Sequence, residues 1–450
     1  MEAVDFILGP IYFLLIYFWA KSYSSRFATP FLRKHFVNGL LFKLIGAIAV
    51  SLVYWYVYGG GDSIEYFKRS LWAKILIQED IVSGLTLLFG DIENFDTYTA
   101  TFINAVKANE PSSFMVVRFA TIANLFTFSS YLCSSFLFAL LSYYGIWKAF
   151  RFFLNLYPAY SKTVAIAFLY IPSVAFWGSG IFKDNITFGF LCLLFISLYD
   201  IFLLRKNIIR NLAIAITSIY LIGVIKSYIL MAFLPSFALW LFLEFRKKIS
   251  SSALRSLSTP IFIGLAGVAG IFVLQLLGSA FSKFSVDNFE QKASGMQRWH
   301  TKRGVMKSEE GSGSSTYSLG DVDFSATGIA KKAPLAIAVA IFRPFPWEVK
   351  SATMLLAAME SLWLLYCTLK LLPYFFQKPG RFLATLSDNP ALAFSLIFSL
   401  IFAFSVGFTS YNFGALSRYR IPFLPFYFMF VTILLDKLRV SQEVVKNKVV

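Results

Sequence analysis

The sequence predicts an all-α, polytopic integral membrane protein, and three observations predict it. Of its 450 residues, 58% are hydrophobic and only 14% are charged, whereas a soluble chain carries roughly 25% charged residues. The mean hydropathy is +0.67. Many apolar runs approach or exceed the roughly 20 residues that a helix needs to cross a bilayer. We expect about eleven transmembrane or re-entrant helices within a single membrane domain over residues 1–450.

Charge, cysteine and histidine content exclude several other classes of protein. The net charge of +17 comes mostly from short loops between apolar runs, which is the positive-inside pattern of membrane proteins and not a nucleic-acid-binding surface. Cys133, Cys192 and Cys367 lie in apolar segments and are interpreted as small buried hydrophobic residues. With only His35 and His300, a zinc hydrolase is disfavoured. No Gly-x-x-x-x-Gly-Lys-[Ser/Thr] phosphate loop is present, so a soluble NTPase is unsupported.

The apolar runs predict the order of the spans. Residues 163–204 read as a hairpin of two short spans, and residues 211–243 as two short helices or a re-entrant pair with a sunken tip. Single spans are expected at 4–20, 39–58, 119–141, 260–277, 353–373, 391–408 and 421–436. Basic residues in alternate loops place the N-terminus on the extracytoplasmic side and the C-terminus in the cytoplasm of a plasma (inner) membrane protein.

Two large loops are predicted on the extracytoplasmic side. In residues 59–118 eight acids outnumber five bases, and the apolar residues of 64–76 recur at helical spacing, which predicts an amphipathic helix along the membrane interface. Residues 279–350 form the second loop, with a linker-like, mobile segment near 305–325. The second loop ends in a short apolar helix after Lys331 and Lys332.

The hairpin at 163–204 is interrupted by small residues and by Lys183 and Asp184. Ionisable groups at membrane depth are costly and tend to mark function. An ordinary turn with a snorkelling lysine, or a mutual Lys183–Asp184 pair, is the alternative interpretation. Lys226 is the only charged residue between positions 210 and 244, and Tyr228 follows it.

Three further polar motifs fall on the same predicted side of the membrane. Asp62 and Glu65 follow three glycines, where they could also cap a helix. Arg343 and Glu348 flank a Pro- and aromatic-rich segment that could instead anchor the chain at the interface. A third motif precedes the last span and contains Arg418 and Arg420, which could simply flank that span.

Together these motifs predict transfer from a lipid-linked phosphate or pyrophosphate. A carboxylate can accept the proton of an acceptor hydroxyl, so Asp62 and Glu65 are the candidate catalytic residues. Cationic groups can bind the anionic leaving group and stabilise its developing charge. The candidates for this role are Lys183, Lys226, Arg343, Arg418 and Arg420, with Asp184, Tyr228 and Glu348 in support. No metal-binding motif is present, and dependence on a divalent ion stays open.

Three elements carry a resemblance to known families: Gly-Asp-x-x-x-Tyr from Gly61, Pro-Ser-x-x-x-Trp-x-Ser-Gly-x-x-Lys-Asp from Pro172 and Arg-Tyr-Arg-Ile-Pro-x-x-Pro from Arg418. The first resembles the start of multi-spanning bacterial glycosyltransferases of the GT-C type. The other two are similar to segments of these enzymes and of polysaccharide polymerases of the EpsG/Wzy-like kind. The resemblance implies a polyprenyl-phosphate-linked sugar donor, a glycan acceptor and a catalytic Asp62. The chain departs from the GT-C pattern because its acidic element follows the second span and lacks an Asp-x-Asp pair.

Two other classes of function stay open. A transporter or flippase of anionic lipid-linked substrates would distribute its charges along a path through the membrane, whereas the predicted charges gather at one side. A non-catalytic scaffold would tolerate single charge changes in all the outer motifs. Membrane lipids are expected partners under each reading, and nucleic acid is not.

Overall fold

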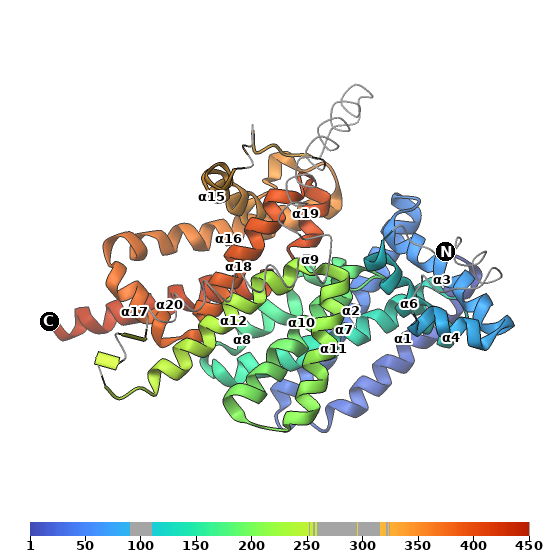
Figure 1. Ribbon diagram of the computed structural model, residues 1–450, viewed down its shortest axis with the longest axis horizontal. Coiled ribbons are helices and arrows are strands. Elements are labelled where there is room, and N and C mark those ends of the chain that lie inside the picture. Colours follow the sequence, from blue (N-terminus) through green and yellow to red (C-terminus); the bar gives the residue numbers. More distant parts are fainter. Residues whose placement is uncertain are drawn as a thin grey trace. The chain divides into compact units, whose positions relative to one another are not determined.

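The computed structural model describes residues 1–90, 110–251, 316–320 and 325–449, together with positions 253, 254, 257, 258, 295 and 323. Their secondary structure is helical apart from one isolated antiparallel bridge between Thr316 and Asn412 (Figure 1). The predicted all-α class is therefore confirmed for the part of the chain that is described.

The chain divides into two compact units. The first contains Met1–Leu156, Phe168–Leu198 and Ile209–Lys226, and the second contains Tyr157–Ala167, Tyr199–Ile208 and Ser227–Val450. The prediction of a single membrane domain stays a prediction.

The described residues contain eight helices, or continuous helical runs, that are long and apolar enough to cross a membrane. Two bent helix pairs raise this number to ten if each pair is one span. The eight are α1 (Ala3–Ser24), α2 (Pro30–Leu52) with η1 (Val53–Val57), the run Pro158–Trp177, α10 (Lys183–Tyr199) with η5 (Asp200–Leu204), α11 (Ile208–Lys226), α12 (Tyr228–Lys247), α16 (Ala352–Gln377) and α18 (Pro390–Thr409). The chain is therefore a multi-pass membrane protein. The predicted span at 260–277 lies outside the described residues.

The run Pro158–Trp177 is a chain of short helical pieces and not one regular helix. It consists of η3 (Pro158–Tyr160), α8 (Ser161–Ala165), η4 (Ile166–Tyr170) and α9 (Pro172–Trp177). Pro172 begins α9, where its missing N–H costs no helical hydrogen bond. Residues 178–182 then form the turn into α10, so the predicted hairpin is present.

The predicted span at 119–141 is interrupted by a sharp bend. Residues 119–141 are divided between α6 (Pro111–Phe126) and α7 (Tyr131–Leu156), and the two helices are bent by 114°. At the bend, Phe128 and Ser129 adopt positive φ angles of 51° and 64°. The Asp5 carboxylate of α1 accepts hydrogen bonds from Ser130 Oγ at 2.7 Å and from the Leu132 N–H at 3.0 Å. These bonds satisfy polar groups that a helix break would leave open in an apolar setting.

The run at 211–243 divides at the predicted place but gives longer helices than expected. Only Ser227 separates α11 from α12. The helices extend to Ile208 and Lys247 and contain 19 and 20 residues. At 1.5 Å per residue each is about 30 Å long, the thickness of the hydrocarbon core. Two full-length helices therefore replace the expected short pair.

The predicted amphipathic helix of the first large loop is α3 (Asp62–Glu79), which buries Ile64, Phe67 and Leu76. A second helix that the sequence analysis missed, α4 (Ile81–Phe89), follows it. Residues 91–109 of this loop lie outside the described residues.

The described part of the second large loop contains residues 316–320, α15 (Ala326–Phe342) and η7 (Pro346–Glu348). The predicted short apolar helix after Lys331 and Lys332 is α15, which begins before these residues. Residues 305–315 of the predicted mobile segment, like His300, lie outside the described residues.

Glycines allow close helix contacts in the first unit. A Cβ atom on Gly145 of α7 would lie 2.1 Å from the carbonyl oxygen of Gly189 on α10. A Cβ on Gly46 of α2 would lie 2.2 Å from the carbonyl oxygen of Ala175 on α9. Small residues at such points let helix backbones approach closely in membranes.

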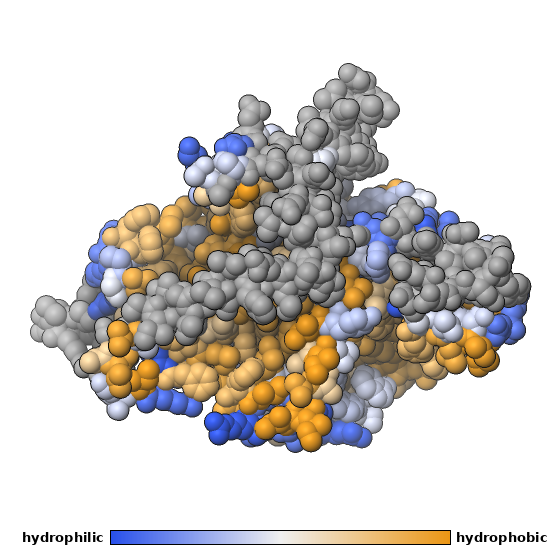
Figure 2. Space-filling model, viewed as in Figure 1, coloured by the Kyte–Doolittle hydropathy of each residue, from blue (hydrophilic) through white to orange (hydrophobic). Residues whose placement is uncertain are grey.

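In the second unit α18 packs against α12, α15 and α20 (Leu424–Val449). Aromatic side chains fill these contacts, among them Phe233, Phe394, Phe398, Phe402, Phe423 and Phe426. The unit also contains α17 (Pro379–Asp388) and a second bent pair, α19 (Phe413–Tyr419) with the start of α20, bent by 73°. Apolar residues cover much of the visible surface, as expected for helices that face lipid (Figure 2).

Candidate functional site

In the first unit, the ring of Tyr54 lies next to Gly61, which precedes Asp62, and next to Phe182, which precedes Lys183. Gly61, with a φ of 110°, precedes α3, and a Cβ atom on it would lie 3.0 Å from Tyr54 Cε1. The centroid of the Tyr54 ring also lies 5.1 Å from the centroid of the Phe182 ring. Each candidate residue therefore follows directly after a residue that contacts the same buried ring.

Asp62 and Glu65 lie exposed in the first turn of α3. Glu65 forms an ion pair of 3.8 Å with Arg69 one helical turn later. Two carboxylates in the first turn also stabilise the helix start, where the backbone N–H groups carry partial positive charge. Both carboxylates stay within reach of solvent.

Lys183 begins α10, and its amine is partly exposed. Lys183 Nζ donates a hydrogen bond of 3.0 Å to Ser112 Oγ and lies 3.7 Å from the Glu110 carboxylate. Glu110 and Ser112 belong to the start of α6, so the amine joins the beginnings of two helices. The alternative pairing of Lys183 with Asp184 stays a prediction.

Asp184 instead forms a buried ion pair with Lys226. Lys226 Nζ at the end of α11 donates to Asp184 Oδ1, and the two side chains are 7% and 1% exposed. The two predicted hairpin tips thus meet through opposite charges. Next to them, the buried Asn185 donates through Nδ2 to the Gly180 carbonyl at 2.9 Å. These bonds fix the turn that leads into Lys183.

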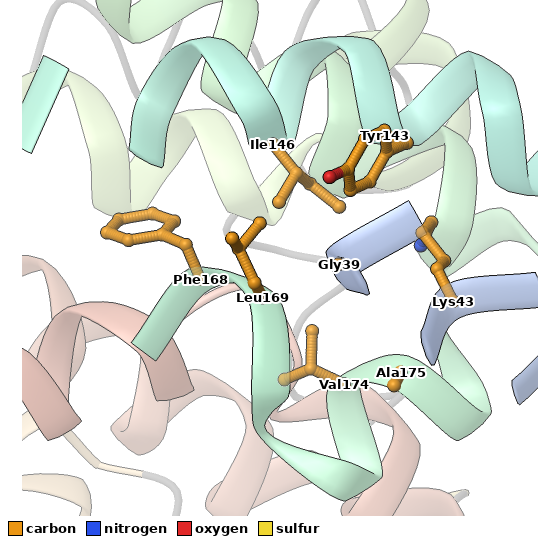
Figure 3. A pocket seen from close by; sticks show the side chains of 8 residues that line it. All are labelled: Gly39, Lys43, Tyr143, Ile146, Phe168, Leu169, Val174 and Ala175. Carbon is orange, nitrogen blue, oxygen red and sulfur yellow. The ribbon is translucent and has the colours of Figure 1, made fainter. Parts of the chain in front are cut away.

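Lys43 is a charged residue that the sequence analysis did not select. It lies in α2, is buried, and donates to the carbonyl oxygen of Gly178 in the same turn. Lys43 also lines a small cavity with Gly39 and Tyr143 (Figure 3). The cavity volume is about 10 Å³, which is at most the space for one water molecule. Lys43 therefore holds the turn in place through this hydrogen bond. The cavity is too small for a substrate.

In the second unit, Arg343 and Glu348 form a paired cluster. The Arg343 guanidinium donates to both Glu348 carboxylate oxygens, through Nε at 3.1 Å and through Nη2. Glu348 also accepts from the Phe345 N–H at 2.8 Å. The Arg343 guanidinium lies over the Phe413 ring at 4.8 Å. This two-pronged pairing with an aromatic contact holds a partly exposed guanidinium in one orientation.

The Arg343–Glu348 pair changes the acidity of the carboxyl group. Partial burial works against ionisation of Glu348. The hydrogen bonds from Arg343 and the Phe345 N–H, together with the charge of Arg343, outweigh that effect and lower the pKa of Glu348 below its usual value.

Arg420 is fully buried and contacts the backbone of the Arg343 segment. Its guanidinium donates to Ser361 Oγ at 2.7 Å, to the Ala357 carbonyl at 2.9 Å and to Glu360 at 3.2 Å. It also reaches the carbonyl oxygen of Arg343 at 3.4 Å. With no solvent-exposed surface, Arg420 acts on the framework of the cluster.

Arg418 and Tyr228 are the remaining two predicted residues. The Arg418 guanidinium lies 5.3 Å from the Tyr419 ring centroid and is partly exposed. Tyr228 packs its ring against Phe402 at 5.5 Å, so its aromatic face belongs to the core of the second unit.

The structure therefore brings the predicted residues together in two sets. Asp62, Lys183, Asp184 and Lys226 belong to the first unit, and Arg343, Glu348 and Arg420 to the second. That both sets line one extracytoplasmic cavity stays a prediction. Among the residues that the structure describes, no group of three or more His, Cys, Asp or Glu side chains is arranged to hold a metal ion.

Sequence reasoning missed Lys43, Glu110 and Glu360. Lys43 and Glu360 are charges within apolar helices, so the rule that selected Lys226 would also have found them. Glu110 gives no such signal because it belongs to a polar loop.

Comparison of the sequence with protein-family models, with curated proteins and with solved structures finds no match.

Proposed function

We propose that the protein is a membrane glycosyltransferase or polymerase that builds a cell-surface glycan on the extracytoplasmic face from a polyprenyl-(pyro)phosphate-linked sugar. The observation that carries the proposal is the shared contact of the Asp62 and Lys183 loops with the Tyr54 ring. The residue after Gly61 is a solvent-exposed carboxylate, and the residue after Phe182 is a partly exposed amine. These are the two kinds of group that the reaction requires.

In the proposed reaction, Asp62 accepts the proton of the acceptor hydroxyl as that oxygen attacks the anomeric carbon of the donor sugar. The new bond is the glycosidic C–O bond. The bond from the anomeric carbon to the phosphate oxygen breaks, and the polyprenyl (pyro)phosphate leaves with the electron pair. Glu65 lies one turn along the same helix and assists Asp62 through its negative charge.

The cationic residues divide into two roles according to their exposure. Lys183 of the first unit is 20% exposed and Arg343 of the second unit is 26% exposed, so each is accessible to an anionic group. Arg418 is the third partly exposed cation of this kind. Lys226 and Arg420 are buried against carboxylates and hold the turns on which Lys183 and Arg343 lie.

The test compares two isosteric neutralisations on one helix. In a deletion strain of the source organism, Asp62→Asn should lower the amount of surface glycan by about 100-fold or more, the usual contribution of a general base. Glu79→Gln removes an exposed carboxylate at the opposite end of α3 and should leave the glycan unchanged. The measurement is glycan staining together with immunoblots of the membrane fraction.

The immunoblot separates loss of chemistry from loss of insertion. Equal amounts of membrane-inserted Asp62→Asn and Glu79→Gln proteins with equal glycan would contradict the proposal.

A further inference from the structure

We infer that α4 is embedded in one leaflet of the bilayer, with lipid acyl chains against its exposed face. This inference concerns the anchoring of the first large loop and does not rest on the proposed reaction. With nine residues, α4 is about 14 Å long and cannot cross the hydrocarbon core. Its position in the membrane must therefore follow from its surface and its contacts.

The surface of α4 is sharply divided. Gly84, Leu87 and Leu88 face the protein and are buried. The opposite face exposes Ile81, Val82, Leu85 and Phe89, at 64%, 69%, 48% and 75% of their surface. No residue of α4 is charged. Apolar residues are visible on the surface where Figure 1 places α4 (Figure 2).

The polar groups at both ends of α4 have partners within the protein. Asp80 accepts hydrogen bonds from the Val82 N–H at 3.0 Å and from Ser83 Oγ at 2.5 Å. At the other end, Arg118 of α6 donates to the Leu87 carbonyl at 3.0 Å and to the Gly90 carbonyl at 2.5 Å. A helix end that enters a lipid phase needs such partners because no water is there to replace them.

The hydroxyl group on the exposed face is also satisfied. Thr86 Oγ1 donates to the Val82 carbonyl one turn earlier at 2.9 Å. The exposed face therefore presents hydrocarbon and an internally bonded hydroxyl, which a lipid environment accepts at little cost.

A chain of contacts places α4 at the depth of a membrane span. Arg118 joins α4 to α6, and the carbonyl of Phe126 at the end of α6 accepts a hydrogen bond of 2.5 Å from Tyr12 of α1. Tyr12 lies nine residues after Ala3, about 14 Å along α1. The bend of 114° then separates the direction of α6 from that of α7. In Figure 1, α3, α4 and α6 lie together beside α1.

Lipid fits this face better than a protein partner does, because the face continues an apolar surface that lipid must cover. Phe126 and Phe128, beside Tyr12, are 66% and 71% exposed. The span α1 itself exposes Phe6, Ile7, Ile11, Leu14, Leu15, Phe18 and Trp19. Amphipathic elements with a charge-free apolar face insert between the headgroups and the acyl chains of one leaflet.

Spin labels on the whole protein in nanodiscs test this inference. With the three native cysteines replaced by alanine, Val82→Cys, Leu85→Cys and Phe89→Cys each carry one nitroxide. Collisions with oxygen, which concentrates in lipid, are compared with collisions with a water-soluble nickel complex. We expect a high oxygen-to-nickel ratio at all three positions, as at Leu14→Cys on the exposed face of α1, and a low ratio at Lys68→Cys on the exposed face of α3.

Two outcomes would overturn the inference. A ratio at the α4 positions equal to that at Lys68→Cys would place the face in water. Labels shielded from both reagents would show a protein partner or a second copy on it.

Unmodified protein provides an independent measurement. A phospholipid with a diazirine on its acyl chain should, after illumination, label residues 81–89 as well as the spans. Labelling of the spans without labelling of α4 would contradict lipid embedding.

Discussion

The ion pair between Lys226 and Asp184 stands out at the residue scale because both charges are buried between helices. Taking two charges out of water is costly, and their attraction offsets that cost only while both partners are present. The pair connects the end of α11 to the start of α10, so it controls the turn that carries Lys183. Removal of one partner would leave an uncompensated charge in an apolar region.

We predict that Lys226→Met destabilises the protein by about 3–5 kcal/mol, the usual effect of breaking a buried pair from one side. The double variant with Asp184→Asn should recover part of that loss. Lys68→Met, at an exposed position of α3, should have little effect. The measurement is the thermal unfolding midpoint of the purified protein in detergent. A double variant less stable than Lys226→Met would contradict the pairing.

Glu348 allows a prediction about pH. Its pKa is lower in the folded protein than in the unfolded chain, so its contribution to stability is present above the unfolded value and is lost as pH falls through the folded value. Wild type should be more stable than Glu348→Gln at neutral pH, and the difference should shrink on acidification below about pH 4, the ordinary range of a glutamate. Unfolding midpoints measured across this range test it. A difference that does not vary with pH would show that Glu348 acts through packing alone.

At the scale of elements, the contacts between helices decide which glycines are essential. Gly189 of α10 lies against the backbone of α7, where a Cβ atom would lie 2.7 Å from Ser142 Cα. Gly380 of α17 has open space around it. The same substitution should therefore have opposite effects at these two helical positions.

We predict that Gly189→Ala lowers the yield of folded protein, because two helix backbones must separate to accept the methyl group. Gly380→Ala should be neutral or slightly stabilising, because alanine favours a helix over glycine by about 1 kcal/mol. Size-exclusion chromatography of each variant after extraction measures the folded fraction. Equal behaviour of the two variants would refute the close contact.

The sequence predicts most of the spans because a span requires a long apolar run. It does not predict the bend between α6 and α7, because the chain stays apolar through the break. The carboxylate that accepts hydrogen bonds at the bend belongs to Asp5, more than a hundred residues away. Helix α4 was missed for a related reason: an uncharged helix of nine residues is too short to signal a span.

At the scale of the whole molecule, part of the candidate site is predictable. Rare charges within apolar runs, such as Lys183, Asp184 and Lys226, are visible in the sequence. Their partners are not, because contacts such as Lys226–Asp184 and Arg420–Glu360 join residues 42 and 60 positions apart. This explains why Lys226 and Arg420 were expected to bind phosphate but are buried against carboxylates. Exposure follows from packing, which local sequence does not specify.

The central claim is that the chain transfers sugar from a lipid-linked donor with Asp62 as the base. The most direct measurement is transfer by purified protein in liposomes, supplied with lipid-linked saccharides extracted from the deletion strain. Wild type and Glu79→Gln should form glycan at equal rates. Asp62→Asn should form it more slowly by about 100-fold or more. Absence of transfer by wild type, or an Asp62→Asn rate equal to that of wild type, would contradict the claim.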